Sequence, residues 1–522
     1  MKEKTGKKIS IRSVVQDENP ALTNTVIVNG AYLFSTFGDR LWMFAVGIFM
    51  TRIGGLSWVA IQQLVDSLTK LLLLPMVGTR LDKFNRNRGM QLVLLCNNLS
   101  IVVSACAFYV GETKFAKESG ALKHIALIMA LIFGSISRVA SEAQRITFNK
   151  DWIIVLVENT NGATRLSTQN SIMGAIDHAA NMIAPVIVGG VIDNISSQAC
   201  CIFIILWNIV SWILEGFVLF WVYKRTPALA TKKGDEKFEV EQALCGISAF
   251  KAYKRQSCFR AAFGLALLYM TVLGFDNLAI SYGLSQGVSA SALGSLRSFG
   301  ALLGMLGIFT YTLMERTIGL VFAAFIGLLL QNIAINLCST STVLPGNPFN
   351  ATGFISNMNL QEWSGHVKNG IMKAGLETDK VQALPIWQLP PSIILFFTGI
   401  TLARYGLWIA DPAISQIMQH TIPERERYTV FGAQTAICEF FSVIKDLLVI
   451  SFPVVEMFGL LSLISCCFVF TGFLFYFSYF IKNLRTKFEL ENENDKELIE
   501  IGAKSETVPL AEFEKTDIEK DV

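Results

Sequence analysis

Long apolar stretches recur along this chain, and they limit its fold more than any other feature of the sequence. Twelve of them reach the length of about 20 apolar residues that an α-helix needs to cross a bilayer. They lie at about 26–51, 57–79, 90–111, 122–145, 168–193, 200–223, 260–284, 288–312, 317–339, 390–412, 428–452 and 457–481, and the fourth could continue towards residue 157. Only 16% of the 522 residues are charged, and the mean hydropathy is +0.47. The sequence therefore predicts an all-α membrane protein with twelve transmembrane helices.

The positions of lysine and arginine predict how these helices are oriented. Basic residues gather in the N-terminus, in the loops after the second, sixth and tenth stretches, and at the start of the C-terminal tail. Basic loops remain on the cytoplasmic side of a membrane, so we expect both termini to be cytoplasmic. The segment 340–389 then becomes an extracellular loop, which carries the glycosylation sequon Asn350-Ala351-Thr352. A net charge of +3 does not indicate nucleic-acid binding, and the expected surroundings are the lipid bilayer.

A basic, polar segment at 224–256 divides the twelve stretches into six and six. Two six-helix repeats are typical of transporters that bind their substrate between the repeats. We therefore predict a cytoplasmic N-terminal tail, an N-terminal lobe, a cytoplasmic linker, a C-terminal lobe that includes the loop 340–389, and a cytoplasmic tail that we expect to be disordered. Their boundaries are 1–25, 26–223, 224–256, 257–482 and 483–522.

Charged residues lie inside several of the apolar stretches. Asp39 and Arg40 follow Gly38 in the first stretch, and Asp276 follows Gly274 in the seventh. A charge at the centre of a membrane costs about 2.5–3.5 kcal/mol, so it needs a partner, a water-filled cavity or a ligand. We interpret Asp39 as facing a substrate path, and a static ion pair with Arg40 or with another helix is the alternative.

A second pair of charges lies one helical turn apart in the second stretch. Asp66 and Lys70 have the i,i+4 spacing at which a carboxylate and an ammonium stabilise each other on one helix face. We expect these two side chains to pair.

The loop after the second stretch contains a glycine and an acidic residue four positions apart, followed by basic residues. Gly78, Asp82, Arg86 and Arg88 resemble the GxxxD-basic signature of the major facilitator superfamily. The resemblance implies the fold of that superfamily and a latch between cytoplasmic helix ends. A plain positive-inside anchor would also account for the two arginines.

Several longer segments together resemble the ferroportin family of iron exporters. They read FSTFGDRLWMFAV, NKDWIIVLV, AIDHAANMIAPVIVGG, VYKRTPALA, LLYMTVLGFDNLAISYGLSQG and ARYGLWIADPAISQ, and they are collinear from about residue 28 to 482. The resemblance implies export of Fe²⁺ by alternating access at the plasma membrane, by a protein that is not an enzyme and holds no prosthetic group. We expect a monomer. The chain contains no GxxxxGK[ST], HExxH or serine-elbow motif.

The resemblance implies a metal site in the N-terminal half. Ferroportins place an aspartate and, four residues later, a histidine on the first helix; here these positions are Asp39 and Met43. A thioether is a poor ligand for hard divalent ions, so Met43 is a weak ligand or only packs. Asp177 and Asn181 match polar positions of the family. His178 points about 100° away from them and is a structural histidine or a substitute for the missing imidazole.

The C-terminal half departs further from the family. Vertebrate members use an aspartate and a cysteine on the seventh helix and a histidine on the eleventh; here we find Asp276, Asn277 and Lys445. Three interpretations of Lys445 stay open: a built-in cation that replaces the second metal or proton, a titrating group, or a structural partner of Asp446, Glu439 or Asp411. Without the cysteine and histidine we expect no binding of the hormone hepcidin, which fits an invertebrate member.

Other polar residues are candidates for gating or for an activating ion. Asp151, which precedes Trp152, and Arg404 and Asp411, together with Asp82, Arg86 and Arg88, are candidates for ion pairs that break as the lobes move. The resemblance also implies an activating Ca²⁺ near the first-helix aspartate, at Asn97, Asn98, Asn208 and Glu215. Oxygen ligands of this kind suit Ca²⁺.

Two alternative functions stay open. The replacement of histidine and cysteine could change the substrate to Mn²⁺, Co²⁺ or Zn²⁺. The chain could also be a membrane scaffold or sensor that keeps the fold but does not transport. Retention of Asp39 and Asp276 argues against this second alternative, and Lys445 argues for it.

Overall fold

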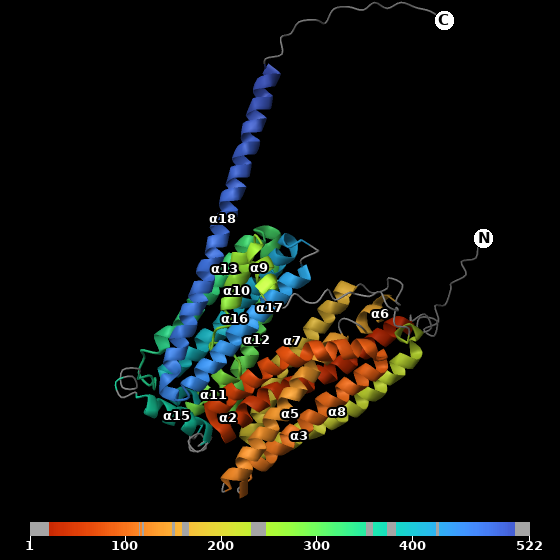
Figure 1. Cartoon of the computed structure of the whole chain (residues 1–522), viewed down its shortest axis with the longest axis vertical. Helices are drawn as coiled ribbons and strands as arrows, with labels where there is room; N and C mark the ends of the chain where they lie inside the picture. Colours follow the sequence, from red (N-terminus) through yellow and green to blue (C-terminus); the bar gives the residue numbers. More distant parts are fainter. Residues whose placement is uncertain are drawn as a thin grey trace, which may run out of the picture.

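The protein is almost entirely helical in the computed structural model (Figure 1). The structure describes residues 20–113, 115–116, 119–148, 152–158, 166–230, 247–350, 356, 359–372, 383–423 and 427–506. Of the helices in this part of the chain, nine are long and apolar enough to span a membrane.

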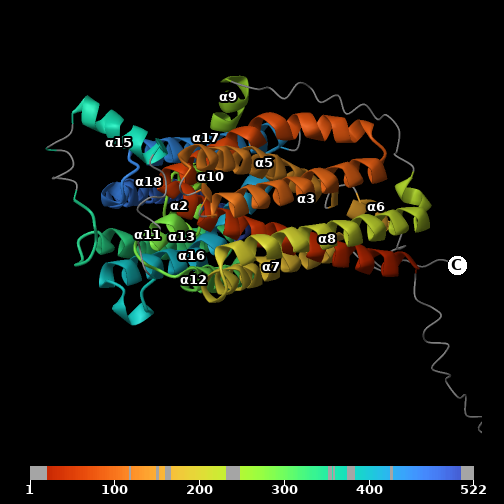
Figure 2. The same cartoon turned by 90° about the horizontal axis from the view of Figure 1, so that it is seen from below.

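The N-terminal half, residues 20–230, contains five long helices and two short ones. They are α2 (Pro20–Lys83), α3 (Arg86–Gly111), α5 (Gly120–Thr147), α6 (Ile153–Glu158), α7 (Leu166–Asn194), α8 (Ser197–Arg225) and the 3₁₀ turn η2 (Pro227–Leu229). Helix α2 packs against α5, α7 and α8, and α3 lies between α5 and α8. Figure 2 shows α3, α5, α7 and α8 side by side, with α15 near the left edge of the view.

A glycine divides α2 into two arms. Gly55 has φ 72° and ψ −173°, a backbone conformation outside the helical region that glycine adopts without steric cost. The chain reverses there, so the two apolar stretches expected at 26–51 and 57–79 are the two arms of α2.

The C-terminal half, residues 247–506, is built from α9 to α18. Its elements are α9 (Ile247–Arg255), α10 (Phe259–Leu267), α11 (Asn277–Ser285), α12 (Ala290–Thr317), α13 (Leu320–Ser341), α15 (Leu360–Met372), η4 (Ile386–Gln388), α16 (Pro391–Thr421), α17 (Arg427–Ser451), η6 (Val455–Met457) and α18 (Phe458–Glu506). Helix α16 packs against α12 and α13, and α18 packs against α10 and α13.

Two expectations about these helices were wrong. The stretch at 260–284 is not one helix, because the backbone between Leu267 and Asn277 leaves the helical path and restarts with Asp276 as the N-cap of α11. The helical pattern also does not end at residue 482. Helix α18 continues to Glu506, through a segment rich in the helix formers glutamate, leucine and lysine.

The two halves meet closely at one end of the molecule and diverge towards the end at which α9 lies (Figure 1). Helix α7 packs against α12, and α2 packs against α11 and α17. Glycines allow the first contact: a Cβ on Gly294 of α12 would lie 2.3 Å from the carbonyl oxygen of Pro185, and one on Gly189 would lie 2.6 Å from that of Ala290.

Helix α15 bridges both halves at this closed end. The indole nitrogen of Trp58, on the second arm of α2, donates to the carbonyl of Ile371 at 2.9 Å. The indole of Trp363 donates to the carbonyl of Ser451, at the end of α17, also at 2.9 Å. The segment 340–389, expected as a loop, therefore contains a helix that contacts both halves.

Candidate functional site

A cavity of about 300 Å³ lies between the two halves. We call it the central cavity. Both arms of α2, together with α5, α11, α12 and α17, line it. Its lining includes Asp39, Met43, Asp276, Asn277 and Lys445, so the structure brings together candidate residues that are up to 406 positions apart in the sequence. Its polar lining residues are Asp39, Gln62, Gln63, Asp66, Ser67, Lys70, Ser137, Arg138, Ser141, Asp276, Asn277, Arg297, Ser442 and Lys445.

Asp39 lies on the first arm of α2 and faces the central cavity. Its Oδ1 accepts a hydrogen bond from Asn97 Nδ2 of α3 at 2.9 Å, and its Oδ2 accepts one from the hydroxyl of Ser141 of α5. In the described part of the chain, Asp39 forms no ion pair, and the predicted alternative of a pair with Arg40 is wrong. Within these residues the carboxylate is held by neutral hydrogen-bond donors alone.

Met43 lies one turn after Asp39, as its spacing predicts, but its sulfur is occupied. Sδ accepts from Arg138 Nη1 of α5 at 2.9 Å and from Arg40 Nη1 at 3.4 Å. Arg40 also forms an ion pair with Asp177 of α7 at 2.9 Å. Asp177 also lines a second, smaller cavity of about 70 Å³, together with Asp39 and Met43. Its charge is neutralised there by Arg40.

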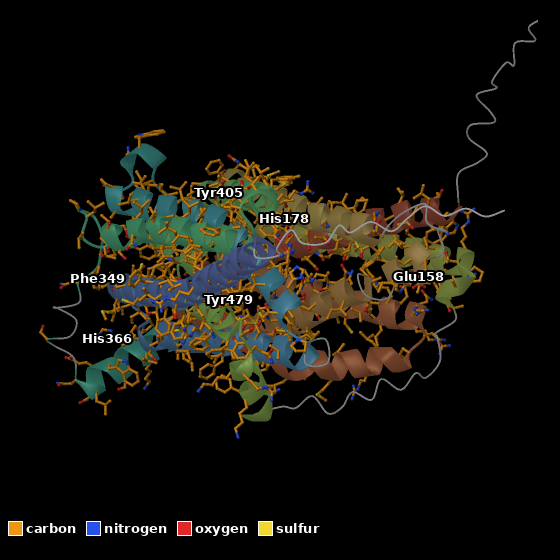
Figure 3. All side chains as sticks on the ribbon, turned by 90° about the horizontal axis from the view of Figure 1, so that it is seen from above. Glu158, His178, Phe349, His366, Tyr405 and Tyr479 are labelled. Carbon is orange, nitrogen blue, oxygen red and sulfur yellow. The ribbon has the colours of Figure 1, made fainter. Side chains whose placement is uncertain are left out.

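Two further candidates on α7 lie outside these cavities. Asn181 lies one turn after Asp177 and lines neither of them. His178 packs edge-on against the ring of Trp408 of α16, with 5.5 Å between ring centroids, at the border between the two halves (Figure 3). The structure therefore supports the structural interpretation of His178 and does not bring its imidazole to Asp39.

Two of the residues proposed for Ca²⁺, Asn97 and Glu215, belong to a buried chain of hydrogen-bonded polar side chains next to Asp39. Asn97 also donates to Gln144 Oε1 at 3.3 Å, and Gln144 Nε2 donates to Glu215 Oε2 at 3.4 Å. Asn98 and Asn208 are buried, and each donates its amide to the carbonyl four residues earlier on its own helix.

This arrangement fits a hard cation. The chain joins two carboxylates, Asp39 and Glu215, through neutral amides. Asparagine and glutamine each carry one oxygen that can turn towards a bound ion, and Ca²⁺ prefers such oxygen ligands. Gln144 belongs to this set although the sequence analysis did not select it.

The carboxylate of Asp276 is fully engaged within the C-terminal half. Its Oδ1 caps α11 by accepting from the backbone N–H groups of Leu278 and Ala279 at 3.1 and 3.2 Å. Its Oδ2 forms an ion pair with Lys445 Nζ of α17 at 3.3 Å. Lys445 also contacts Asp446 Oδ1 at 3.3 Å. The ammonium group thus lies where a metal would need to bind Asp276.

Neutral amides connect this region to the N-terminal half. Asn277 Nδ2 donates to Gln62 Oε1 of α2 at 3.3 Å. Gln63 satisfies two neighbours when its oxygen accepts from the backbone N–H of Asn277 at 3.2 Å and its nitrogen donates to Asp446 at 3.3 Å. Gly47 of the first arm makes room, because a Cβ there would lie 2.5 Å from the Asn277 side chain.

An ion pair between the halves was missed by the sequence analysis. Lys70 of α2 lies 3.4 Å from Glu439 of α17. The expected pair between Asp66 and Lys70 was therefore wrong, because the lysine reaches across to the other half. Asp66 instead accepts from the amide of Gln62 and from the hydroxyl of Ser135 at 2.7 Å.

The structure describes only some of the expected gating residues. Arg86 Nη1 lies 3.5 Å from the carbonyl of Ala228 within the same half, and Arg88 is exposed. Trp152 is fully buried against a cluster that includes Tyr32, so it is a core residue. Asp151 and the side chain of Asp82 lie outside the described residues.

Arg404 and Asp411 of α16 face a separate cavity of about 380 Å³ in the C-terminal half. Asp276 and Lys445 reach the same cavity from its other side. Within the described residues, neither Arg404 nor Asp411 forms an ion pair with the N-terminal half, so the structure does not show them as an inter-half gate.

The described residues contain no cluster of three histidine, cysteine or carboxylate side chains that could hold a metal. A metal in the central cavity would therefore be bound by single carboxylates, neutral oxygens and water.

Comparisons with known proteins agree with this architecture. The sequence matches the family described as Ferroportin1 (FPN1) over residues 23–469. It is 30% identical to Solute carrier family 40 member 1 of Danio rerio, over 87% of this chain and 91% of that protein, and 29% identical to Ferroportin of Homo sapiens, over 87% and 90%.

A solved structure shows that the fold is shared. The crystal structure of a bacterial homologue of the iron transporter ferroportin in an inward-facing state superposes with a TM-score of 0.65 and 19% identity, over 88% of this chain and 99% of that one. Because the family match covers most of the sequence, this chain belongs to the ferroportin family, whose members are membrane transporters and not enzymes.

Proposed function

We propose that this protein exports ferrous iron from the cytosol across the plasma membrane by alternating access. The observation that carries the proposal is Asp39: its carboxylate faces the central cavity, and it forms no ion pair within the described residues. A charge of this kind in a membrane helix is costly unless a ligand uses it.

The proposed architecture is that of the major facilitator superfamily, with twelve transmembrane helices in two six-helix lobes. The two arms of α2 count as two spans, and α10 with α11 counts as one interrupted span. With α3, α5, α7, α8, α12, α13, α16, α17 and α18 this makes twelve. The interrupted span places the capping residue Asp276 beside the cavity, as broken helices do in many transporters.

The proposed orientation places the end with α9 in the cytosol. Lys251, Lys254 and Arg255 lie on α9, and Lys224 and Arg225 end α8. By the positive-inside rule these residues are cytoplasmic. The halves meet at the opposite end, through α7, α12 and α15, so the structure would be inward-facing and ready to accept an ion from the cytosol.

The geometry suggests how Asp39 would bind the ion. Fe²⁺ would approach the carboxylate from the cavity, and the hydroxyl of Ser141 could turn a lone pair towards it after releasing Asp39. Met43 would contribute little, because Arg138 and Arg40 hold its sulfur. Asp177 would serve to hold Arg40 away from Asp39.

Lys445 would take the role of a built-in cation in the C-terminal half. Its ion pair with Asp276 supports this interpretation, while its ion pair with Asp446 is one of those that the structural interpretation expects. The fixed positive charge would repel a second divalent ion from Asp276. Export would then proceed without a metal bound to that carboxylate.

The Ca²⁺ that activates export in this proposal would be held by Asp39, Asn97, Asn208 and Glu215. Its charge would replace the amide N–H groups that now donate hydrogen bonds to the two carboxylates. This proposal makes Ca²⁺ removal a test separate from iron itself.

Efflux of radioactive iron from loaded cells tests the proposed function. Wild-type protein should export iron, and Asp39→Asn should not, although it reaches the cell surface in the same amount. Glu362→Gln is the matched control, because Glu362 is an exposed carboxylate on α15 that lines neither cavity. Equal efflux from Asp39→Asn and wild type would contradict the proposal and favour a scaffold or sensor.

A second candidate substrate is Mn²⁺. Within the described residues the central cavity offers no imidazole or thiol, and its free ligands are hard oxygens. Hard oxygen ligands suit Mn²⁺ better than they suit the softer Co²⁺ or Zn²⁺. Efflux of manganese that exceeds efflux of iron in the same cells would favour this substrate.

A further inference from the structure

We propose that Asp66 is a second binding position for the exported cation, deeper in the central cavity than Asp39. The inference rests on the proposed transport of a divalent metal and names a residue that the family resemblance does not include. Its starting observation is that Asp66 lines the same cavity as Asp39 but is not part of the ion pair its sequence spacing predicts.

The carboxylate of Asp66 is buried and forms no ion pair in the described part of the chain; Arg138 and Lys70, which line the same cavity, act on it only from beyond ion-pair distance. Asp66 is 9% exposed, and in the described part of the chain no lysine or arginine nitrogen lies within ion-pair distance of it. Lys70, one turn later, is held by Glu439 of the other half. A buried carboxylate without a partner is costly unless a cation occupies the adjacent space for part of the transport cycle.

Asp66 and Asp39 accept hydrogen bonds from the same two kinds of donor. Each carboxylate accepts one hydrogen bond from a side-chain amide and one from a serine hydroxyl of α5. The amides belong to Gln62 and Asn97, and the hydroxyls to Ser135 and Ser141. Neutral donors of this kind stabilise the carboxylate while no ion is bound. A metal ion displaces them more easily than it would displace a lysine held in an ion pair.

The two serines set the distance between the carboxylates along the pathway. Ser135 and Ser141 are six residues apart on α5, or about 9 Å along the helix axis. Helix α5 begins at Gly120, at the end of the molecule opposite to α9 (Figure 1). Asp66 therefore lies closer than Asp39 to the proposed extracellular side, and an ion would reach it after Asp39.

Asp66 is also coupled to the contact between the halves. Gln62 donates to Asp66 and at the same time accepts from Asn277 of α11 at 3.3 Å. When the halves separate at this end, the bond between Gln62 and Asn277 breaks and the amide can turn away from Asp66. Opening towards the extracellular side would thus change the ligands of an ion at Asp66, while those at Asp39, held by α3 and α5, stay in place.

The C-terminal carboxylate cannot provide this second position. Asp276 uses one oxygen to cap α11 and the other to bind Lys445. Of the three carboxylates that line the central cavity, Asp39 and Asp66 are the two without an ion pair in the described part of the chain. The pathway for the cation therefore runs along the N-terminal half.

Binding of Co²⁺ alone to the purified full-length protein, followed by calorimetry, tests the proposal. Wild type should bind two ions, and Asp66→Asn should bind one, while its melting temperature stays close to that of wild type. Asp66→Glu should restore the second ion. In proteoliposomes, Asp66→Asn should lower Co²⁺ flux at least tenfold. The proposal is overturned if folded Asp66→Asn binds as many ions as wild type with the same affinity.

A second pair of variants separates ion binding from a structural role. Glu439→Gln releases Lys70, which then lies one turn from Asp66 and can pair with it. Ion binding at Asp66 should weaken in Glu439→Gln and recover in Glu439→Gln/Lys70→Gln. A structural carboxylate would be stabilised by the released lysine without any change in ion binding. Unchanged binding in both variants would overturn the proposal.

The proposed function and this inference fail in different ways. If Asp39→Asn abolishes flux but Asp66→Asn does not, metal transport stands and the second position is wrong. If wild-type protein neither binds nor transports Co²⁺, Fe²⁺ or Mn²⁺, the proposed function and the inference are both wrong.

Discussion

Lys70 of α2 and Glu439 of α17 form an ion pair of 3.4 Å between the N-terminal and C-terminal halves. The two side chains are 23% and 25% exposed, so water reaches the pair in this conformation. Each residue belongs to a different half, and rocking of the halves must therefore change the distance between them. We therefore expect the strength of this ion pair to differ between conformations of the transporter.

We expect neutralisation of either residue to slow metal flux and exchange of the two charges to restore it. A partly exposed pair contributes about 0.2–1 kcal/mol, so Lys70→Gln and Glu439→Gln should each change flux by a factor of about five or less. The double exchange Lys70→Glu/Glu439→Lys should return flux towards wild type. Flux in proteoliposomes, analysed as a double-mutant cycle, checks this.

If the losses of flux caused by the two single substitutions add up in the double exchange, the two residues act independently. Lys482→Gln is the control, because Lys482 is an exposed lysine on α18 that lines none of the cavities described above. Its flux should equal that of wild type.

Much of the helical architecture could be predicted from the sequence, because long apolar stretches leave few alternatives in a membrane. Breaks in helices were harder to predict. Gly274 and Asp276 interrupt the apolar pattern of the seventh stretch, but the sequence does not show whether a helix bends or ends there. The structure shows that the helix ends and that a new one, α11, begins with Asp276 as its N-cap.

The sequence predicts some of the residues of the candidate site but not the contacts between them. Asp39 and Asp276 stood out because charge is rare in membrane helices, and the structure places both at one cavity. Pairings between distant helices do not follow from spacing. Lys70 was assigned to Asp66 because they are one turn apart, whereas its partner, Glu439, lies 369 positions away.

Replacement of Met43 by histidine should strengthen metal binding at Asp39. The imidazole would lie one turn from the carboxylate and is a better ligand than a thioether for Fe²⁺ and Co²⁺. We expect about tenfold tighter Co²⁺ binding, equivalent to ~1.4 kcal/mol. Calorimetry with Co²⁺ measures it. Arg138, whose guanidinium now donates to the sulfur at 2.9 Å, must turn away first.

Met43→Leu is the matched control for this prediction. It removes the sulfur but keeps the size and the apolar character of the side chain, so metal binding should not change. A marked loss of Co²⁺ binding in Met43→Leu would show that the thioether is itself a ligand and would contradict the interpretation of Met43 as packing.

Substitutions of Asp276 should separate its two roles. Asparagine keeps an oxygen that can cap α11 but loses the ion pair with Lys445, and alanine loses both. Loss of an N-cap costs about 1 kcal/mol. We therefore expect the melting temperature to fall in the order wild type, Asp276→Asn, Asp276→Ala, measured by size-exclusion thermostability in detergent. Equal values for asparagine and alanine would mean that the cap contributes little stability.

The contact between α7 and α12 should depend on the absence of a side chain at Gly294. A methyl group there would lie 2.3 Å from the carbonyl of Pro185, so Gly294→Ala must push the two helices apart. We expect this variant to open the end at which α7, α12 and α15 meet and to shift the protein away from the conformation described here. The labelling rate of Ser291→Cys by a membrane-impermeant maleimide, corrected for the parent chain, should rise severalfold.

Gly174→Ala provides the comparison, on α7, the helix that packs against α12. No atom lies within 4 Å of a Cβ at Gly174, so this substitution adds a methyl group without contact and should leave labelling unchanged. Alanine stabilises a helix by about 1 kcal/mol relative to glycine. A gain in stability that both variants share is therefore due to this helix propensity and not to the contact between α7 and α12. If Gly294→Ala labels no faster than Gly174→Ala, the close packing of α7 on α12 does not hold this end closed.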